Sequence, residues 1–172
     1  MNNSVQALVM NFYNSTITGN HKIQIGQLAS SVWNQPHVQV LKNLYDQCKF
    51  TGFSIKFRHA GSMVQDDNTL ATIPTPVAAC ILFTEGAEDP SFEQTLTKKP
   101  SILLSLSDKS IGMGVPEPNS YKDCDSSSVT WPISSWLYVE PADTSSPSAE
   151  YYTEITFKLT FTKLEIKIQT IS

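Results

Sequence analysis

A switch in hydrophobic period early in the chain constrains the fold more than any other feature. Apolar side chains first recur every three or four residues, as in a helix: Val38, Leu41, Leu44, Tyr45 and Cys48. Pro36 stands near the first turn, where its missing N–H would have no intrahelical partner. The period then falls to two, which places Phe53, Ile55 and Phe57 on one side of a strand. We therefore expect one short helix near residues 36–48, packed on an end or edge of a sheet.

Strand patterns dominate the rest of the chain. Continuous or alternating apolar runs occupy residues 5–13, 21–28, 53–59, 77–84, 101–107, 129–140 and 151–170. The pattern of residues 5–13 also fits a short helix. Pro132 cannot donate a hydrogen bond to a β-ladder, so we expect two short strands, one on each side of it. In the last run the apolar residues change parity near Thr162 and Lys163, which predicts a bulge or a tight bend.

Segments without a sustained period separate these strands. The long ones are predicted loops at residues 60–76, 108–128 and 140–149, and residues 85–94 are expected to form a loop or a brief helix. We expect an all-β fold, a single jelly-roll β-sandwich of two antiparallel sheets. The pattern alone also fits an immunoglobulin-like sandwich, although such a domain is usually smaller and lacks the early helix.

Size and charge narrow the class of protein. A chain of 172 residues fits one domain, 1–172, with no N-terminal basic arm. The net charge of −4 argues against a nucleic-acid binder that works through bulk positive charge. The longest apolar run, residues 77–83, is far shorter than the roughly 20 residues of a membrane-spanning helix, so we expect no membrane insertion. Residues 1–20 lack the pattern of a secretory signal, which favours the cytosol or nucleus.

The sequence has no recognisable catalytic or metal-binding pattern. His21, His37 and His59 lie outside any known motif, and phosphate-binding glycine-rich loops are absent. The odd number and wide spacing of the cysteines favour reduced thiols at Cys48, Cys80 and Cys124. Several oxygen-bearing residues lack the spacing of a calcium loop and are interpreted as polar loop residues: Asp66, Asp67, Asn68, Glu85, Glu88 and Asp89. We expect no enzyme activity, no metal site and no cofactor.

The residues at the change of period resemble one family. The run Leu44-Tyr45-Asp46-Gln47-Cys48-Lys49, followed by alternating residues 53–57, is similar to a helix-to-strand passage in capsid proteins of circovirus-like, Rep-encoding circular single-stranded DNA viruses. Those proteins carry a Leu-Tyr-Asp-Gln-aromatic-Lys segment, and Cys48 stands here in place of the aromatic residue. The residues that match the motif are Leu44, Tyr45, Asp46, Gln47 and Lys49.

The resemblance implies a jelly roll in which residues 38–48 connect strands B and C and residues 53–59 form strand C. It also implies a viral coat subunit that assembles with itself into a T=1 icosahedral shell of about 60 copies around circular single-stranded DNA. The loops would then form subunit contacts and the host-facing surface, which meets an unknown receptor. The protein would reside in the virion, after synthesis in the host cytoplasm and assembly in the nucleus. Family members commonly begin with an Arg-rich arm, and this chain has none, which argues against strong genome binding.

Two groups of basic residues are candidate nucleic-acid contacts. Lys56, Arg58 and His59 form a strip on one strand, and Lys163 and Lys167 form another near the end of the chain. Both would meet DNA phosphates on the interior of a shell. Alternatively, they form an ordinary solvated strand face, where lysine prevents unwanted strand pairing.

Aromatic residues leave a second function open. Two interpretations fit six of them: they stack on a glycan or a nucleobase, or they belong to the core and to subunit contacts. The six are Trp33, Trp131, Trp136, Tyr138, Tyr151 and Tyr152. The stacking interpretation fits a non-viral jelly-roll binding module, either a trimeric receptor ligand or a glycan binder. The capsid interpretation is preferred because the expected helix and strand occupy the place that the resemblance requires.

Overall fold

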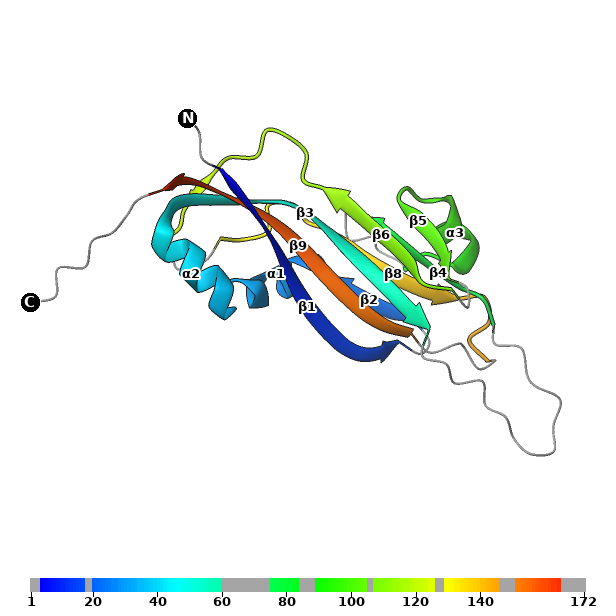
Figure 1. The fold of residues 1–172 in the computed structure, drawn as a ribbon. Helices are drawn as coiled ribbons and strands as arrows, with labels where there is room; N and C mark the ends of the chain where they lie inside the picture. The colour runs from blue at the N-terminus through cyan, green and yellow to red at the C-terminus, as the bar shows by residue number, and fades with distance from the viewer. Residues whose placement is uncertain are drawn as a thin grey trace, which may run out of the picture.

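Two antiparallel sheets face each other across one hydrophobic core in the computed structural model (Figure 1). The structure describes residues 4–17, 20–59, 75–83, 89–104, 107–125, 129–145 and 151–164. Sheet A has the strand order β1 (Val5–Ile17), β9 (Tyr151–Leu164), β3 (Tyr45–His59) and β6 (Lys109–Gly114). Sheet B has the order β2 (His21–Gln24), β8 (Trp136–Pro141), β4 (Val77–Leu82) and β5 (Ser101–Leu104). The short strand β7 (Lys122–Asp123) pairs with the start of β3.

This strand order is that of a jelly roll. When the eight longer strands are lettered B to I along the chain, sheet A reads B-I-D-G and sheet B reads C-H-E-F. The predicted fold class is therefore confirmed. The predicted lettering is wrong, because two strands precede the helical region and β3 is strand D. Residues 38–48 thus lie between strands C and D, with their last residues inside β3, and residues 53–59 belong to strand D.

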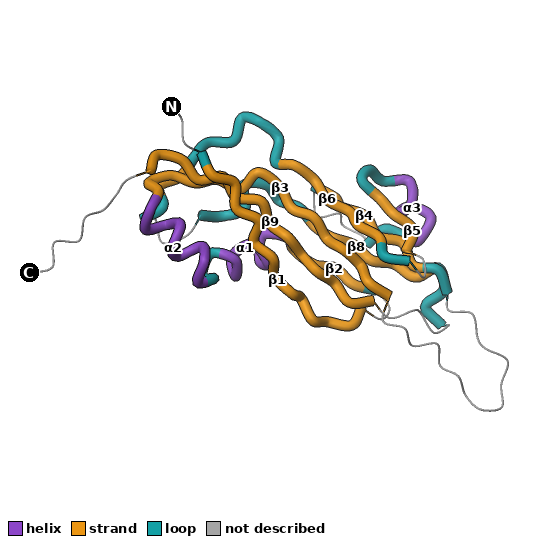
Figure 2. Tube along the Cα trace, in the orientation of Figure 1, coloured by secondary structure: helices purple, strands orange, loops and turns teal. Residues whose placement is uncertain are grey.

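Three helices are present among the described residues, where one was expected (Figure 2). They are α1 (Ile25–Val32), α2 (Pro36–Leu44) and α3 (Phe92–Thr97). The strand predicted over residues 21–28 ends at Gln24, because Ile25, Ala29 and Val32 are buried at helical spacing. The helical period was concealed in the sequence because Ile23 and Ile25 alternate with polar residues and Gly26 lies inside the helix. The brief helix allowed within residues 85–94 corresponds to α3, which starts at Phe92 and is capped by Ser91.

Helix α2 ends four residues before the predicted end, because Cys48 lies on β3. The pairing register of β3 with β9 shifts between Phe50 and Gly52. This irregularity changes the parity of the strand, so Cys48 and Phe50 face the same core as Phe53. Tyr45 and Cys48, both buried, stand three residues apart, which resembles helical spacing in the sequence. Beyond it Phe53, Ile55 and Phe57 alternate as predicted.

Aromatic rings fill the middle of the core. Phe50, Phe53 and Phe157 of sheet A surround Trp131, with ring centroids 5.6, 5.3 and 5.8 Å from that indole. All three contacts are edge-to-face, an arrangement that adds about 0.5–1.5 kcal/mol per pair beyond the burial itself. Trp131 precedes β8, and its Nε1 donates to Ser135 Oγ at 2.9 Å. The first of the two short strands expected in residues 129–140 is thus an irregular segment that closes the core.

Strand β6 occupies part of a predicted loop, residues 108–128. Gly112 and Gly114 weakened the strand pattern in the sequence, yet Gly112 is required where it stands. A Cβ atom at Gly112 would lie 2.5 Å from the carbonyl oxygen of Phe53 on the neighbouring strand. The close approach of β6 to β3 therefore depends on this glycine.

The final strand departs from alternation at its predicted place. Tyr151, Ile155, Phe157, Leu159 and Phe161 are all buried on one face. Lys163 adopts φ 61, which turns the backbone out of the strand conformation, so the predicted bend is confirmed. Most of the predicted loop at residues 60–76 and the end of the one at residues 140–149 lie outside the described residues.

Replacement of Tyr45 tests the start of the β3–β9 pairing. The side chain is 7% exposed and its ring centroid lies 6.0 Å from that of Phe161. Tyr45→Ala should lower the free energy of unfolding by roughly 3 kcal/mol, because the cavity removes this packing. Chemical denaturation provides the measurement. The matched control is Tyr152→Ala, since Tyr152 is 46% exposed, and an equal loss in both variants would contradict the assignment.

Candidate functional site

Lys56 and Arg58 lie on the outer face of sheet A, where they form ion pairs. Lys56 Nζ lies 3.2 Å from Asp108 Oδ2. The Arg58 guanidinium lies 2.9 Å from Glu154 Oε2 and 3.8 Å from Asp108 Oδ2. The hydrogen bond to Glu154, followed by the charge of that carboxylate, raises the pKa of Arg58. Two carboxylates thus balance the two cations of the predicted strip. The sequence did not suggest this pairing, because both acids come from distant strands or turns.

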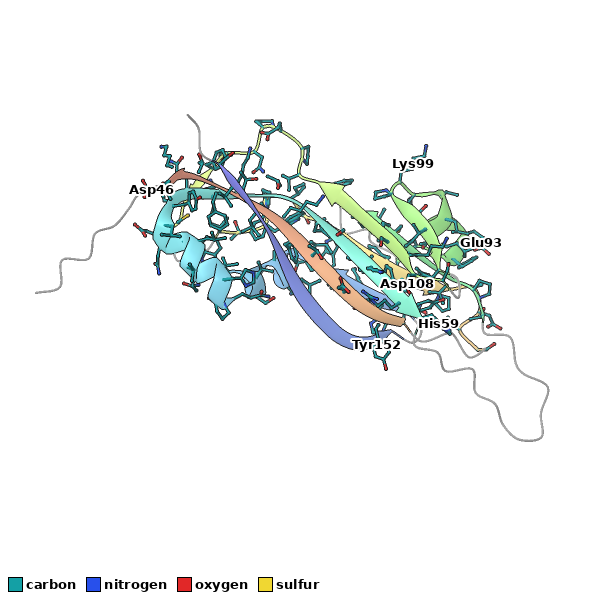
Figure 3. The ribbon with its side chains drawn as sticks, viewed as in Figure 1. Asp46, His59, Glu93, Lys99, Asp108 and Tyr152 are labelled. Carbon is teal, nitrogen blue, oxygen red and sulfur yellow. The ribbon has the colours of Figure 1, made fainter. Side chains whose placement is uncertain are left out.

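The remaining predicted contacts do not extend this strip. His59 packs its ring against Tyr151, with centroids 5.8 Å apart. Figure 3 places His59 and Asp108 at one end of the sandwich and Asp46 at the other. Lys163 belongs to the Asp46 end, because its neighbour Leu164 pairs with Tyr45. At about 3.3 Å per residue, roughly 36 Å separates Lys163 from the partner position of Arg58 on β9. Lys167 lies outside the described residues.

The family-like motif has structural contacts on both sides of the α2–β3 junction. Leu44 ends α2, and Tyr45 opens β3 against Phe161. The Asp46 carbonyl accepts a hydrogen bond of 2.7 Å from the Cys124 N–H. Gln47 lies opposite Thr162 of β9 and Asp123 of β7. These residues position backbone and core.

Lys49, the last motif residue, anchors the segment that follows β6. Its ammonium donates to Glu117 Oε1 at 2.9 Å and to the Asn119 carbonyl at 3.1 Å, and lies 4.8 Å from the centre of the Tyr121 ring. The hydrogen bond from Lys49, together with one from the Asn119 N–H, lowers the pKa of Glu117. Asn119 Nδ2 in turn donates to the Phe50 carbonyl at 2.6 Å. The motif lysine therefore fixes a loop on the start of β3.

Most of the six singled-out aromatic residues belong to the interior. Trp33, Trp131, Tyr138 and Tyr151 are buried, and Trp136 is half-buried. Tyr152 alone among the six is exposed. The core interpretation is thus confirmed for the buried residues, and the six do not form a shared stacking platform.

The cysteines are free thiols, as predicted, and all three are buried. Cys48 and Cys124 contact each other through their side chains. Hydrogen bonding to Cys124, with burial, raises the pKa of Cys48. Within the described residues, no three His, Cys, Asp or Glu side chains are grouped to hold a metal ion. Asp89 forms an ion pair with Lys22 at 3.4 Å, and the other residues weighed for calcium lie outside the described ranges. No helix in the described part of the chain is long and apolar enough to span a membrane.

Glu140 is a buried carboxylate that the sequence analysis missed. It points outward from sheet B near the end of β8, because its neighbour Val139 belongs to the core and Glu140 does not. The residue is 6% exposed. Burial, with a smaller contribution from the charge of Asp89, raises the pKa of Glu140 to about 7. Its position at the boundary between the predicted strand run 129–140 and the predicted loop 140–149 gave no signal of burial.

The comparison with known sequences finds no family model and no curated protein that matches this chain. The comparison with solved structures finds virus shells. Penaeus vannamei nodavirus (T=3) matches with a TM-score of 0.58 at 12% identity, over 96% of this chain and 56% of that one. Mud crab tombus-like virus matches with a TM-score of 0.55 at 12% identity, over 98% and 84% of the two chains. This chain therefore spans little more than half the length of the nodavirus chain.

A third structure is a T=1 subviral particle of a deletion mutant of the Penaeus vannamei nodavirus capsid protein. It matches with a TM-score of 0.53 at 12% identity, over 91% of this chain and 96% of that one. At such low identity the likeness shows the fold, which is the jelly roll found in these virus particles. Neither of the two viruses in these three structures is named as a circular single-stranded DNA virus.

Removal of the two carboxylates tests whether ion pairing neutralises the basic strip. The variant Asp108→Asn with Glu154→Gln should bind single-stranded oligonucleotides more tightly than wild type at low salt. If Lys56 and Arg58 then contact two phosphates, the slope of log affinity against log salt steepens by about 1.4. Fluorescence anisotropy across a salt series measures both quantities. Asp123→Asn with Asp125→Asn changes the net charge equally at the far end of β3, and an equal gain there would contradict the prediction.

The raised pKa of Glu140 predicts a pH dependence of stability. A carboxyl group whose pKa is higher in the folded state binds a proton more readily there than in the unfolded chain. Its contribution is fully present below the unfolded pKa of about 4.3 and is lost as the pH rises to about 7. Thermal melts of wild type between pH 4 and pH 8 should show this loss, and those of Glu140→Gln should show less of it. Parallel curves for the two proteins would contradict the assignment.

Proposed function

We propose that this protein is the coat subunit of a small virus and assembles with copies of itself into a closed icosahedral shell. The observation that carries the proposal is the B-I-D-G and C-H-E-F strand order, together with a likeness to virus-shell structures over 96% of the chain. The role is structural: subunits held by several neighbours form a stable particle even when each contact is weak. The proposed residence is the virion, with synthesis in the host cytoplasm and assembly in the nucleus.

The proposed shell has T=1 symmetry and about 60 copies. Support comes from the T=1 particle of the nodavirus deletion mutant, whose chain is covered to 96% by the present one. The proposed subunit contacts are the loops at the two ends of the sandwich. They include the segment that Lys49 fastens to β3 and the turn around Asp143.

The proposed cargo is circular single-stranded DNA, and the support is the motif Leu44, Tyr45, Asp46, Gln47 and Lys49. Ion pairing of Lys56 and Arg58 weakens the case for tight DNA binding by the strip itself. We therefore expect particles whose formation does not require nucleic acid, since the cations of the strip are already paired within each subunit and need no phosphate as counter-charge.

Negative-stain microscopy and analytical ultracentrifugation of the purified protein test the proposal. The expected result is uniform closed particles after nuclease treatment, in at least one condition of a pH and salt screen. Monomers or trimers under all conditions would contradict it. The double variant Lys56→Gln with Arg58→Gln should still form particles, because these cations pair with carboxylates of their own subunit and not with DNA or a neighbouring copy.

A further inference from the structure

An open cavity of about 550 Å³ lies on the outer side of sheet B, between the start of α3 and the end of β8. Four carboxylates line it: Asp89, Glu93, Glu140 and Asp143. Its wall also includes apolar surface from Pro90, Phe92, Pro141 and Ala142. The cavity thus combines an acidic centre with apolar surface. A lysine side chain has the matching composition, an apolar stem that ends in a cation.

The charge around this cavity is out of balance with the rest of the chain. The described segments that line it, residues 89–94 and 140–145, contain four Asp and Glu and no Lys, Arg or His. Sixteen acidic residues less these four leave twelve, against twelve Lys and Arg, so the remaining chain has no net charge. The net charge of −4 thus equals that of the segments that line the cavity. Two copies are complementary in charge where the cavity of one meets exposed lysines of the other.

Glu140 indicates where a cation would bind. Glu140 lines the cavity, and only 6% of its surface is exposed. Within the described part of the chain its carboxylate forms no hydrogen bond or ion pair, whereas Asp89 pairs with Lys22 and Asp143 accepts from Ser145. A buried carboxylate without a partner loses its hydration and gains nothing in return. A donor from outside the subunit would supply what the fold itself does not.

The cavity suits an organic cation better than a metal ion. The described carboxylates do not gather in a group of three that would hold a metal. A volume of about 550 Å³ is also in the range of sites that take organic groups. A lysine ammonium needs only two or three oxygen acceptors, and the methylene stem can cover the surrounding apolar surface.

We propose that this cavity receives a lysine side chain from a second copy of the chain and pairs its ammonium with Glu140. The inference rests on the proposed function, because assembly brings copies together at high local density. Lys98 and Lys99 are the expected donors. Both are exposed on the turn before β5, and no ion pair involves either among the described residues. In Figure 3, Lys99 projects away from the body of the fold.

Zero-length carbodiimide crosslinking tests the proposal. Equal amounts of ¹⁴N- and ¹⁵N-labelled protein are mixed, assembled, crosslinked and analysed by mass spectrometry. The expected product is a mixed-isotope peptide pair that joins Glu140 to a lysine. Its absence, in the presence of other mixed-isotope pairs, would overturn the proposal and leave shell assembly standing. A Glu140 pair without particles would support the contact and contradict the shell, and the absence of all mixed pairs and particles would reject both.

Substitution of the proposed partners, Glu140 and the two lysines, is a second test of the proposal. Glu140→Gln should raise the subunit concentration required for association about tenfold, as expected for loss of one charge-assisted hydrogen bond. Lys98→Gln with Lys99→Gln should do the same. The control Asp125→Asn removes a charge outside the cavity and should leave association unchanged, and thermal melts confirm that every variant is folded. Equal association of Glu140→Gln and wild type would overturn the proposal.

A calcium titration tests whether the cavity binds a metal ion instead of a lysine side chain. Calcium chloride should leave the melting temperature of the unassembled protein unchanged. If calcium raised the melting temperature of wild type but not of Glu140→Gln, the cavity would be a metal site and the lysine contact would be rejected.

Discussion

The pairing of β3 with β9 holds the two halves of the chain together, and the other elements depend on it. Thirteen residues of β3 pair with β9, from Tyr45 opposite Leu164 to His59 opposite Tyr151. The two strands are about a hundred residues apart in sequence, so closing this loop is costly in entropy and needs a large apolar gain. Phe53 opposite Phe157 and Ile55 opposite Ile155 supply that gain at the centre. β1 and β6 then add to the two sides of this pair.

The same pairing decides where charge lies on the surface. Because His59 and Tyr151 are in register, Arg58 lies within reach of Glu154, and the turn before β6 brings Asp108 beside Lys56. The two cations of the strip are therefore paired within the subunit. The carboxylate of Glu140, on the outer side of sheet B, has no such partner among the described residues. This distribution favours contacts between copies at the acidic cavity over general attraction to nucleic acid at the strip.

Local patterns predicted much of the fold, and distant contacts explain what they missed. The alternation of Phe53, Ile55 and Phe57 and the break near Lys163 are properties of single strands, so the sequence contained them. The true end of α2 lies where Tyr45 becomes extended and begins the pairing of β3 with β9, opposite the distant residue Leu164. Gly112 weakens a strand in isolation, yet its lack of a side chain is needed because Phe53 lies so close.

The candidate surfaces were harder to predict than the fold. The strip Lys56, Arg58 and His59 was found as a pattern of charge, but its partners come from residues about fifty and a hundred positions away. Glu140 stood at the boundary between a predicted strand run and a predicted loop, and its burial follows from the strand order of sheet B and from α3 packing beside it. The sequence around these residues gives no sign of the ion pairs or of the burial of Glu140.

Hydrogen exchange of the free subunit, resolved amide by amide, tests the central claim most directly. If the β3–β9 pair is the element on which the rest depends, its central amides exchange only on global unfolding. We predict the slowest exchange at residues 53–57 and 155–159, with faster exchange in α1, α2 and α3. Fast exchange in these strand segments, together with slower exchange in the helices, would contradict the account.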